Sequence, residues 1–333
     1  MSSVPAPQEI WRDARWLAQA VDPNAGLIRL VDMSAGDYRE ASFLDDRMFE
    51  QPRTSHLLRW IEVADAMPAD ARADVRWIFH IGHVGSTLIA RLMGELEAVL
   101  SIREPRAFRD LLFFPAEVRA KYIPTIQALF SRTFAPGQSA LVKTTSAVSE
   151  IAGELVAEGQ RALFLSTKPR SYISGILAGE NSRNELAAMA DMRRRRFASR
   201  GMDLPATRRD ADAAAAAWAC EMTALEAADG GKVLWADFDI VLGDLDGWLA
   251  RMARHFGFAG SEQDLRAIAN GPLTRRYSKA TEHEYSADLR RSLLSEAEER
   301  HRSEIDSALA MLAKAAETAP LLRKALGRAQ AES

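Results

Sequence analysis

The sequence lacks cysteine pairs and long uncharged apolar runs. Cys220 is the single cysteine, so no intramolecular disulfide can form, which fits a reducing compartment and predicts a cytoplasmic protein. Because it stands in an Ala-rich stretch, we expect a buried structural thiol. No run reaches the roughly 18 apolar residues of a membrane helix, and the first residues lack the basic and apolar parts of a secretion signal. We therefore expect no transmembrane segment.

Net positive charge is also missing. The 43 basic and 46 acidic residues leave a net charge of −3, so no overall basic field attracts nucleic acid or anionic lipid. No His/Cys cluster has zinc spacing, and no Ser-His-Asp motif can be identified. The chain has 333 residues, 47% of them hydrophobic, enough for a large core. An anion site, if present, has to be local.

The chain does contain one stretch typical of an anion site, Trp77–Met93. It starts as an apolar run, breaks at Gly82, passes through Gly85-Ser86-Thr87 and then becomes amphipathic. This pattern predicts a buried strand, a tight loop and a helix. Backbone N–H groups of such a loop and the helix N-terminus favour phosphate or sulfate. The alternative is an ordinary strand-to-helix turn, with Ser86 as a helix cap.

Short apolar runs recur along the chain, separated by helical stretches. We predict strands over residues 75–81, 100–103, 139–143, 161–166 and 232–235. This alternation predicts an α/β fold with a parallel central sheet covered by helices.

Three segments are expected. Residues 1–74 form an N-terminal helical cover, with helices over 9–20, 41–49 and 56–66 and a short strand over 27–33. Residues 75–290 form the α/β domain, and residues 291–333 form a charged C-terminal helical tail with a break at Pro320. The run Arg193–Arg196 is interpreted as a solvated helix face, with a lid over an acidic or polyhydroxylated acceptor as the alternative.

The loop departs from an ATP- or GTP-binding P-loop. That motif ends in Lys and Ser/Thr, and the lysine contacts the β- and γ-phosphates. Here Gly82-His83-Val84-Gly85-Ser86-Thr87 has no lysine at this point. Ordinary nucleoside triphosphate chemistry is therefore disfavoured.

Several motifs, in chain order, resemble those of sulfotransferases that use 3′-phosphoadenosine 5′-phosphosulfate (PAPS), in particular a bacterial sulfotransferase-like branch. His80–Leu88 resembles their 5′-phosphosulfate loop, and Arg103-Glu104-Pro105 resembles the acid that follows it. Leu141–Thr145 resembles their Lys-Thr/Ser strand end. Leu163–Ser174 resembles the 3′-phosphate segment, although Thr167 and Gly175 stand where that family has Arg and Ser. The late strand ending at Asp237 completes the set, which covers about residues 75–290.

The resemblance implies a P-loop-type three-layer fold and transfer of a sulfuryl group from PAPS to a hydroxyl or amine, without a metal. The acceptor is expected to be a small molecule, carbohydrate or lipid-linked, and not a nucleic acid. The implied donor-binding residues are the following: Gly82, His83, Val84, Gly85, Ser86, Thr87, Arg170, Ser171, Ser174, Arg276 and Lys279.

For catalysis, Glu104 is the favoured general base, because it follows a predicted strand, where α/β sheets place their active crevice. A salt bridge with a neighbouring arginine is the alternative for Glu104, and His83 is a rival base. Lys143, also at a strand end, is the expected cation beside the sulfuryl group. Asp237 is interpreted as a structural carboxylate.

Two other functions remain open from the sequence. One is a P-loop kinase or nucleotide hydrolase that uses ATP and Mg²⁺, with Asp237 near the metal. The other is a nucleotide-binding module without catalysis. Acceptor contacts are expected from residues 35–60, 108–135 and 181–210, which carry no readable motif.

Overall fold

The computed structural model describes residues 3–203, 209–230, 232–275 and 287–331. Its centre is a five-stranded parallel sheet with the strand order β5-β6-β4-β7-β8. The predicted parallel α/β fold is confirmed. The strands are β4 (Arg76–His80), β5 (Val99–Arg103), β6 (Ser139–Lys143), β7 (Ala162–Ser166) and β8 (Val233–Asp237).

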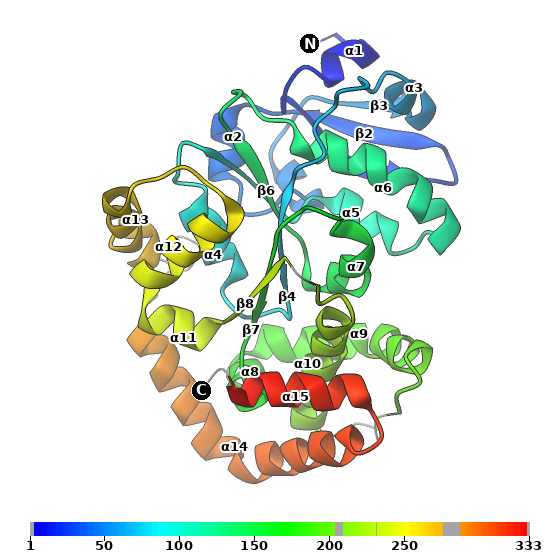
Figure 1. Cartoon of the computed structure of the whole chain (residues 1–333). Coiled ribbons are helices and arrows are strands. Elements are labelled where there is room, and N and C mark those ends of the chain that lie inside the picture. The colour runs from blue at the N-terminus through cyan, green and yellow to red at the C-terminus, as the bar shows by residue number, and fades with distance from the viewer. Residues whose placement is uncertain (1–2, 204–208, 231, 276–286, 332–333) are drawn as a thin grey trace.

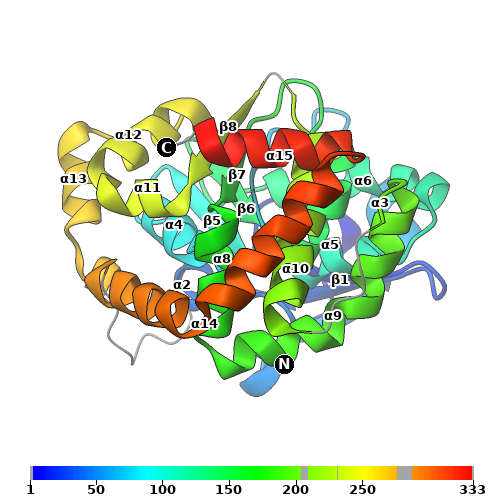
Figure 2. The same cartoon turned by 90° about the horizontal axis from the view of Figure 1, so that it is seen from below.

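Helices cover both faces of this sheet, which explains why its strands are continuous apolar runs. Figures 1 and 2 show α4 (Ser86–Met93) and α12 (Leu245–Phe256) on one side and α6 (Ala116–Ser131) on the other. In the central strand β4, Trp77, Ile78 and Phe79 are fully buried. Since β4 lies in the middle, the loop after it lies at the centre of the carboxyl edge, where parallel sheets bind ligands.

The N-terminal segment contains a sheet, so its prediction as a helical cover is wrong. Strands β1 (Trp16–Asp22), β2 (Leu27–Asp32) and β3 (Ser55–Arg59) pair antiparallel, and the predicted strand over 27–33 is confirmed. Helix α1 (Pro7–Ile10) ends before β1 begins. The helix predicted over 41–49 is wrong, because α2 (Ala35–Glu40) ends before this range and the 3₁₀ helix η1 (Asp46–Glu50) covers only its end. The helix predicted over 56–66 is confirmed for its second half by α3 (Trp60–Asp65), whereas β3 covers its first half.

Hydrogen bonds at the end of β5 connect this N-terminal segment to the main sheet. The buried guanidinium of Arg103 donates to the carbonyl oxygens of Tyr38, Arg39 and Ala41, and the Leu44 N–H donates to the Arg103 carbonyl at 2.8 Å. Burial lowers the pKa of Arg103 to about 9. These bonds hold the loop after α2 beside the carboxyl end of β5.

Helices after β7 enclose the carboxyl edge from the other side. Figure 2 shows the long helix α14 (Ala287–Ala316) running across α8 (Pro169–Leu177) and α10 (Asp210–Ala227). The predicted break at Pro320 is confirmed, because α15 (Pro320–Ala331) begins there. Among the described helices, none combines the length and apolar character needed to cross a bilayer. The remaining elements are α5 (Arg106–Leu111), η2 (Ser146–Ile151), α7 (Ala152–Leu155), α9 (Glu180–Ser199), α11 (Phe238–Gly243), α13 (Glu262–Ala269) and η3 (Pro272–Arg275).

The arginine run on α9 is only partly solvated. Arg194 and Arg195 are exposed, as predicted, but Arg193 and Arg196 are buried against the neighbouring elements. Arg196 donates to the Ala147 carbonyl at 3.0 Å and pairs with Glu150 at 3.3 Å. The interpretation of the whole run as a solvated face is therefore wrong for two of its four residues.

Candidate functional site

The loop after β4 is held at its start by His80. The Gly82 N–H donates to His80 Nδ1 at 2.9 Å, so the other ring nitrogen, Nε2, carries the proton and donates to the Thr144 carbonyl at 3.0 Å. His80 is the last residue of β4 and is 5% exposed. It connects the loop to the chain that follows β6.

The backbone of the loop is in the left-handed region at several points. Gly82, His83 and Gly85 have φ angles of 81°, 53° and 62°. His83 and Glu104 are the non-glycine residues with positive φ in the described chain, and both line the same cavity. Such backbone strain is retained where the surrounding structure fixes it, and it is concentrated at functional sites.

Gly85 is required by a close approach as well as by its φ angle. A Cβ atom at this position would lie 1.9 Å from Cζ of Phe238, whose ring packs directly on the loop. Helix α4 begins at Ser86, with Gly85 as its N-cap. Ser86 and Thr87 are therefore in the first turn, where backbone N–H groups lack helical acceptors. Both side chains are buried, and the N-cap position is held by Gly85 and not by Ser86.

A cation reaches this loop from the neighbouring strand. Lys143, the last residue of β6, is 1% exposed and donates from Nζ to Thr87 Oγ1 at 3.4 Å. The same ammonium forms an ion pair with Glu104 Oε1. The loop sequence contains no lysine, and the ammonium of Lys143 places a positive charge beside the loop instead.

Glu104 directly follows β5 in a left-handed conformation with a φ angle of 53°. Its N–H donates to the Lys143 carbonyl at 2.7 Å, which turns the side chain toward the loop. Its ion-pair partners are Lys143 and Arg47, and not a neighbouring arginine as in the alternative that the sequence left open.

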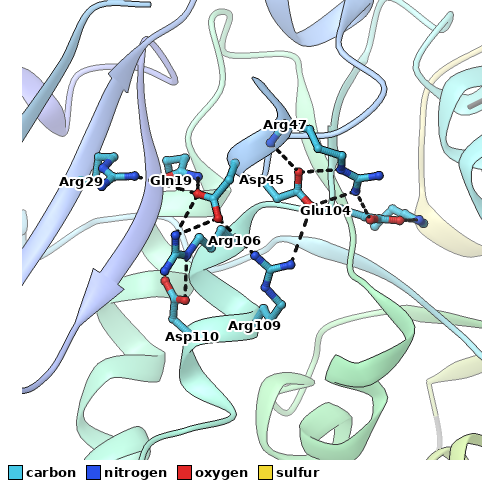
Figure 3. Close-up of polar contacts among 10 residues, drawn as sticks. Gln19, Arg29, Asp45, Arg47, Glu104, Arg106, Arg109 and Asp110 are labelled. Atoms are coloured by element: carbon cyan, nitrogen blue, oxygen red, sulfur yellow. Dashed lines mark hydrogen bonds and ion pairs between the residues drawn. The ribbon is translucent and has the colours of Figure 1, made fainter. Parts of the chain in front are cut away.

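Arg47 of the N-terminal segment reaches Glu104, as Figure 3 shows. Arg47 donates from Nη2 to Glu104 Oε2 at 3.1 Å and to Asp45 Oδ2 at 2.8 Å. Arg109 of α5 lies 3.9 Å from Asp45 Oδ2. The sequence motifs gave no signal for Asp45 or Arg47, because their place beside Glu104 depends on the contacts of Arg103.

These groups open into one cavity of about 980 Å³. Its wall includes the whole loop from Gly82 to Thr87, Glu104, the chain after β6 and parts of α8, α9 and α14. All three segments expected to contact an acceptor contribute to this wall: Phe43 and residues 45–47, Arg109, and Ser182, Glu185 and Met189. The volume lies within the range of small-molecule sites, about 300–1,000 Å³.

Arg290, near the start of α14, brings a second cation to this wall. Its guanidinium lies 5.2 Å from the ring centroid of Phe238 and pairs with Asp239 at 3.0 Å. Phe238 also lines the cavity, so the ring that packs on Gly85 has a cation close to it. Neither residue was singled out from the sequence, since α14 is about 50 positions beyond Phe238.

The other expected donor residues are placed differently. His83 Nε2 pairs with Glu185 at 3.3 Å, and its ring remains in the cavity wall. Arg170 pairs with Glu298 and Asp306 of α14, and Ser171 follows it on α8, outside the residues lining the cavity. Ser174 is buried, and its Oγ has no hydrogen-bond partner among the described residues. Arg276 and Lys279 lie outside the described residues.

Two further residues have structural roles. Asp237 caps α11 by accepting from the Asp239 N–H at 2.8 Å, and burial raises its pKa. Cys220 is fully buried, and burial raises its pKa to about 11, as expected for an inert thiol. Within the described residues, no group of three or more His, Cys, Asp or Glu side chains is arranged to hold a metal ion.

Comparisons with known proteins give structural neighbours at low similarity. No family model matches the chain, and no curated protein matches it. A sulfotransferase domain from the curacin biosynthetic pathway is 12% identical, with a TM-score of 0.39 over 72% of this chain and 97% of that one. Mouse sulfotransferase SULT7A1, complexed with PAP, is 10% identical, with a TM-score of 0.37 over 77% of this chain and 89% of that one. Both of these neighbours are sulfotransferases by name.

Proposed function

We propose that this protein transfers a sulfuryl group from PAPS to a hydroxyl or amine acceptor. The observation that carries the proposal is the position of Lys143 between Thr87 of the loop and Glu104 at the end of β5. One buried ammonium thus contacts both the anion-binding loop and a carboxylate suited to act as base. The ordered motifs described above support the same donor.

The donor would bind with its 5′-phosphosulfate at the loop. Backbone N–H groups at the start of α4 and the hydroxyls of Ser86 and Thr87 would bind the anionic oxygens. Positioning and electrostatic stabilisation carry most of the catalysis in the related phosphoryl transfers, and we expect the same here. Gly85 allows the Phe238 ring to pack directly on the loop backbone, because a glycine has no side chain that would clash with the ring.

In the transfer step, the acceptor oxygen or nitrogen forms a bond to sulfur while the bond from sulfur to the bridging phosphate oxygen breaks. Glu104 takes the acceptor proton, for which its contact with Lys143 has to loosen. Lys143 then stabilises the negative charge that develops on the bridging oxygen. The products are the sulfated acceptor and adenosine 3′,5′-bisphosphate.

Calorimetry tests the donor assignment without knowledge of the acceptor. We expect wild type to bind PAPS and adenosine 3′,5′-bisphosphate, and to bind ATP–Mg²⁺ much more weakly. Lys143→Met should weaken bisphosphate binding about tenfold or more, since a charge-assisted hydrogen bond contributes about 1.5–3 kcal/mol.

Lys314→Met, at an exposed position of α14, is the matched control and should bind like wild type. Tight ATP–Mg²⁺ binding with no binding of either sulfotransferase ligand would instead favour a kinase or hydrolase. Equal affinities of wild type and Lys143→Met for the bisphosphate would remove Lys143 from the donor site.

A further inference from the structure

The cavity has two chemically different halves on either side of the loop. Because β5 and β8 are opposite edges of the sheet and β4 is central, residues after β5 and residues after β7 and β8 lie on opposite sides of the loop. The β5 side is rich in charge, with Asp45, Asp46, Arg47, Glu104 and Arg109. The β7/β8 side is mostly apolar, with Ala178, Met189, Phe238, Leu289, Leu293 and Leu294.

The proposed function, on which this inference rests, assigns the two halves. In a displacement at sulfur, the attacking and leaving oxygens lie roughly in line on opposite sides of the transferred group. The attacking group must reach Glu104, so the acceptor occupies the charged half. The nucleoside then extends toward the apolar half, where an aromatic ring and a cation, Phe238 and Arg290, lie together.

Charged side chains of the acceptor half pair with one another, and Figure 3 marks these contacts with dashed lines. Asp46 lies 2.8 Å from Arg106 and 3.5 Å from Arg109, and Arg47 bonds to both Asp45 and Glu104. The side chains of Asp46, Arg47 and Arg109 remain 48%, 48% and 38% exposed. The half therefore offers hydrogen-bond donors and acceptors without a net field that would select a charged acceptor.

The one aromatic ring in this half does not favour a flat aromatic acceptor. The guanidinium of Arg47 lies 3.4 Å from the ring centroid of Phe43, so that face of the ring is already covered. No other aromatic side chain lines this half among the described residues. A phenol would find little apolar surface here, whereas a molecule with many hydroxyl groups could bond to the exposed carboxylate and guanidinium groups.

We propose that the acceptor is an uncharged, polyhydroxylated molecule of the saccharide class, and that Asp46 and Arg109 determine this specificity. The segment that contributes Phe43–Arg47 belongs to the N-terminal part of the chain, which thereby forms the acceptor site rather than a passive cover. Asp46 accepts from acceptor hydroxyls, and Arg109 donates to them.

The test measures sulfated product by mass spectrometry with PAPS and four acceptors: cellobiose, glucuronic acid, 2-naphthol and 1-octanol. We expect kcat/KM to be highest for cellobiose. Asp46→Asn and Arg109→Gln should raise its KM about tenfold or more, which corresponds to one lost hydrogen bond to a charged group. Their affinity for adenosine 3′,5′-bisphosphate should stay unchanged, which also shows that the variants are folded.

Asp246→Asn and Arg266→Gln are the matched controls, because this exposed pair lies 3.8 Å apart on α12 and α13, outside the cavity wall. Preference for 2-naphthol, 1-octanol or glucuronic acid would overturn the inference. So would bisphosphate binding without any transfer to cellobiose, or an unchanged KM in both cavity variants.

A failure of the proposed function can be distinguished from a failure of this inference. If wild type binds neither PAPS nor the bisphosphate, the proposed donor is wrong. Saturation-transfer NMR of cellobiose with the protein alone then tests the acceptor half separately. A signal that Asp46→Asn abolishes would support a saccharide site, and its absence in wild type would overturn it.

Discussion

Replacing Gly85 by alanine tests whether the loop geometry is essential for donor binding. The added Cβ would lie 1.9 Å from Cζ and 2.1 Å from Cε2 of Phe238, far inside any allowed contact. The ring is 1% exposed, so it cannot move aside without disturbing its neighbours. The φ angle of 62° adds a second penalty, because a side chain disfavours the left-handed region.

Gly201 separates these two effects. Its φ angle is 63°, but nothing lies within 4 Å of a Cβ placed on it. Gly201→Ala should therefore lose only the backbone term, about 1 kcal/mol of the free energy of unfolding. Gly85→Ala should lose about 1–3 kcal/mol more, the usual range for overpacking a filled core.

Urea unfolding and calorimetry with adenosine 3′,5′-bisphosphate measure both consequences. We expect Gly201→Ala to bind the bisphosphate like wild type, and Gly85→Ala to bind it at least about tenfold more weakly, because the displaced loop no longer aligns its N–H groups. Equal losses of stability in the two variants, with equal bisphosphate affinities, would refute the reasoning.

Three further perturbations test single contacts. Glu104→Gln removes the carboxylate that pairs with the 1%-exposed Lys143 and should lose about 3–5 kcal/mol of unfolding free energy. Lys143→Met should lose about 1.5–3 kcal/mol, because Arg47 still bonds to Glu104. The double variant should lose less than the sum of the two, and additive losses in urea unfolding would contradict this. Burial raises the pKa of Glu221 to about 7 from an ordinary value of 4.5, so the folded state holds this proton more tightly and stability falls as pH rises between these values. In Glu221→Gln, the thermal midpoint should therefore fall less steeply with rising pH than in wild type. An equal slope in the two proteins would contradict this role of Glu221. Glu104→Gln should lower kcat about 10²–10⁴-fold and His83→Asn far less; the reverse order would make His83 the base.

The central sheet was predictable from the sequence because parallel strands covered on both faces are continuous apolar runs. The prediction for β6 agrees residue for residue with the observed strand, and the strand ends place Lys143 and Glu104 correctly. The loop was recognisable because Gly82, Gly85, Ser86 and Thr87 are adjacent in the chain. In such a short motif, the residues that determine the backbone geometry are neighbours in the sequence, so the geometry can be predicted from the sequence.

The N-terminal sheet was not predictable from periodicity. In β1, Trp16, Leu17 and Ala18 are all buried, since α5 and α6 pack against this strand, so the alternation of a half-exposed strand is missing. The spacing between these residues and Ile10 and Trp11 happens to match that of a helix, which led to the wrong prediction of a helix over 9–20. A turn after α1 separates the two groups.

The acceptor half of the site was missed for a related reason. Asp45 and Arg47 reach Glu104 only because the Arg103 guanidinium holds three backbone carbonyls of the preceding turn. That contact joins residues about 60 positions apart, and no short motif encodes it. For Arg170 the local motif was misleading. Its position in the motif suggested that it binds a phosphate, but its guanidinium pairs with Glu298 and Asp306 of the distant helix α14.

A crystal structure of the complex with adenosine 3′,5′-bisphosphate tests the central claim most directly. The account predicts the 5′-phosphate at the N–H groups of Gly85, Ser86 and Thr87, within hydrogen-bond distance of Lys143 Nζ, and the adenine toward Phe238. A bisphosphate bound elsewhere, with this loop occupied by no part of it, would contradict the claim that the loop holds a sulfuryl donor.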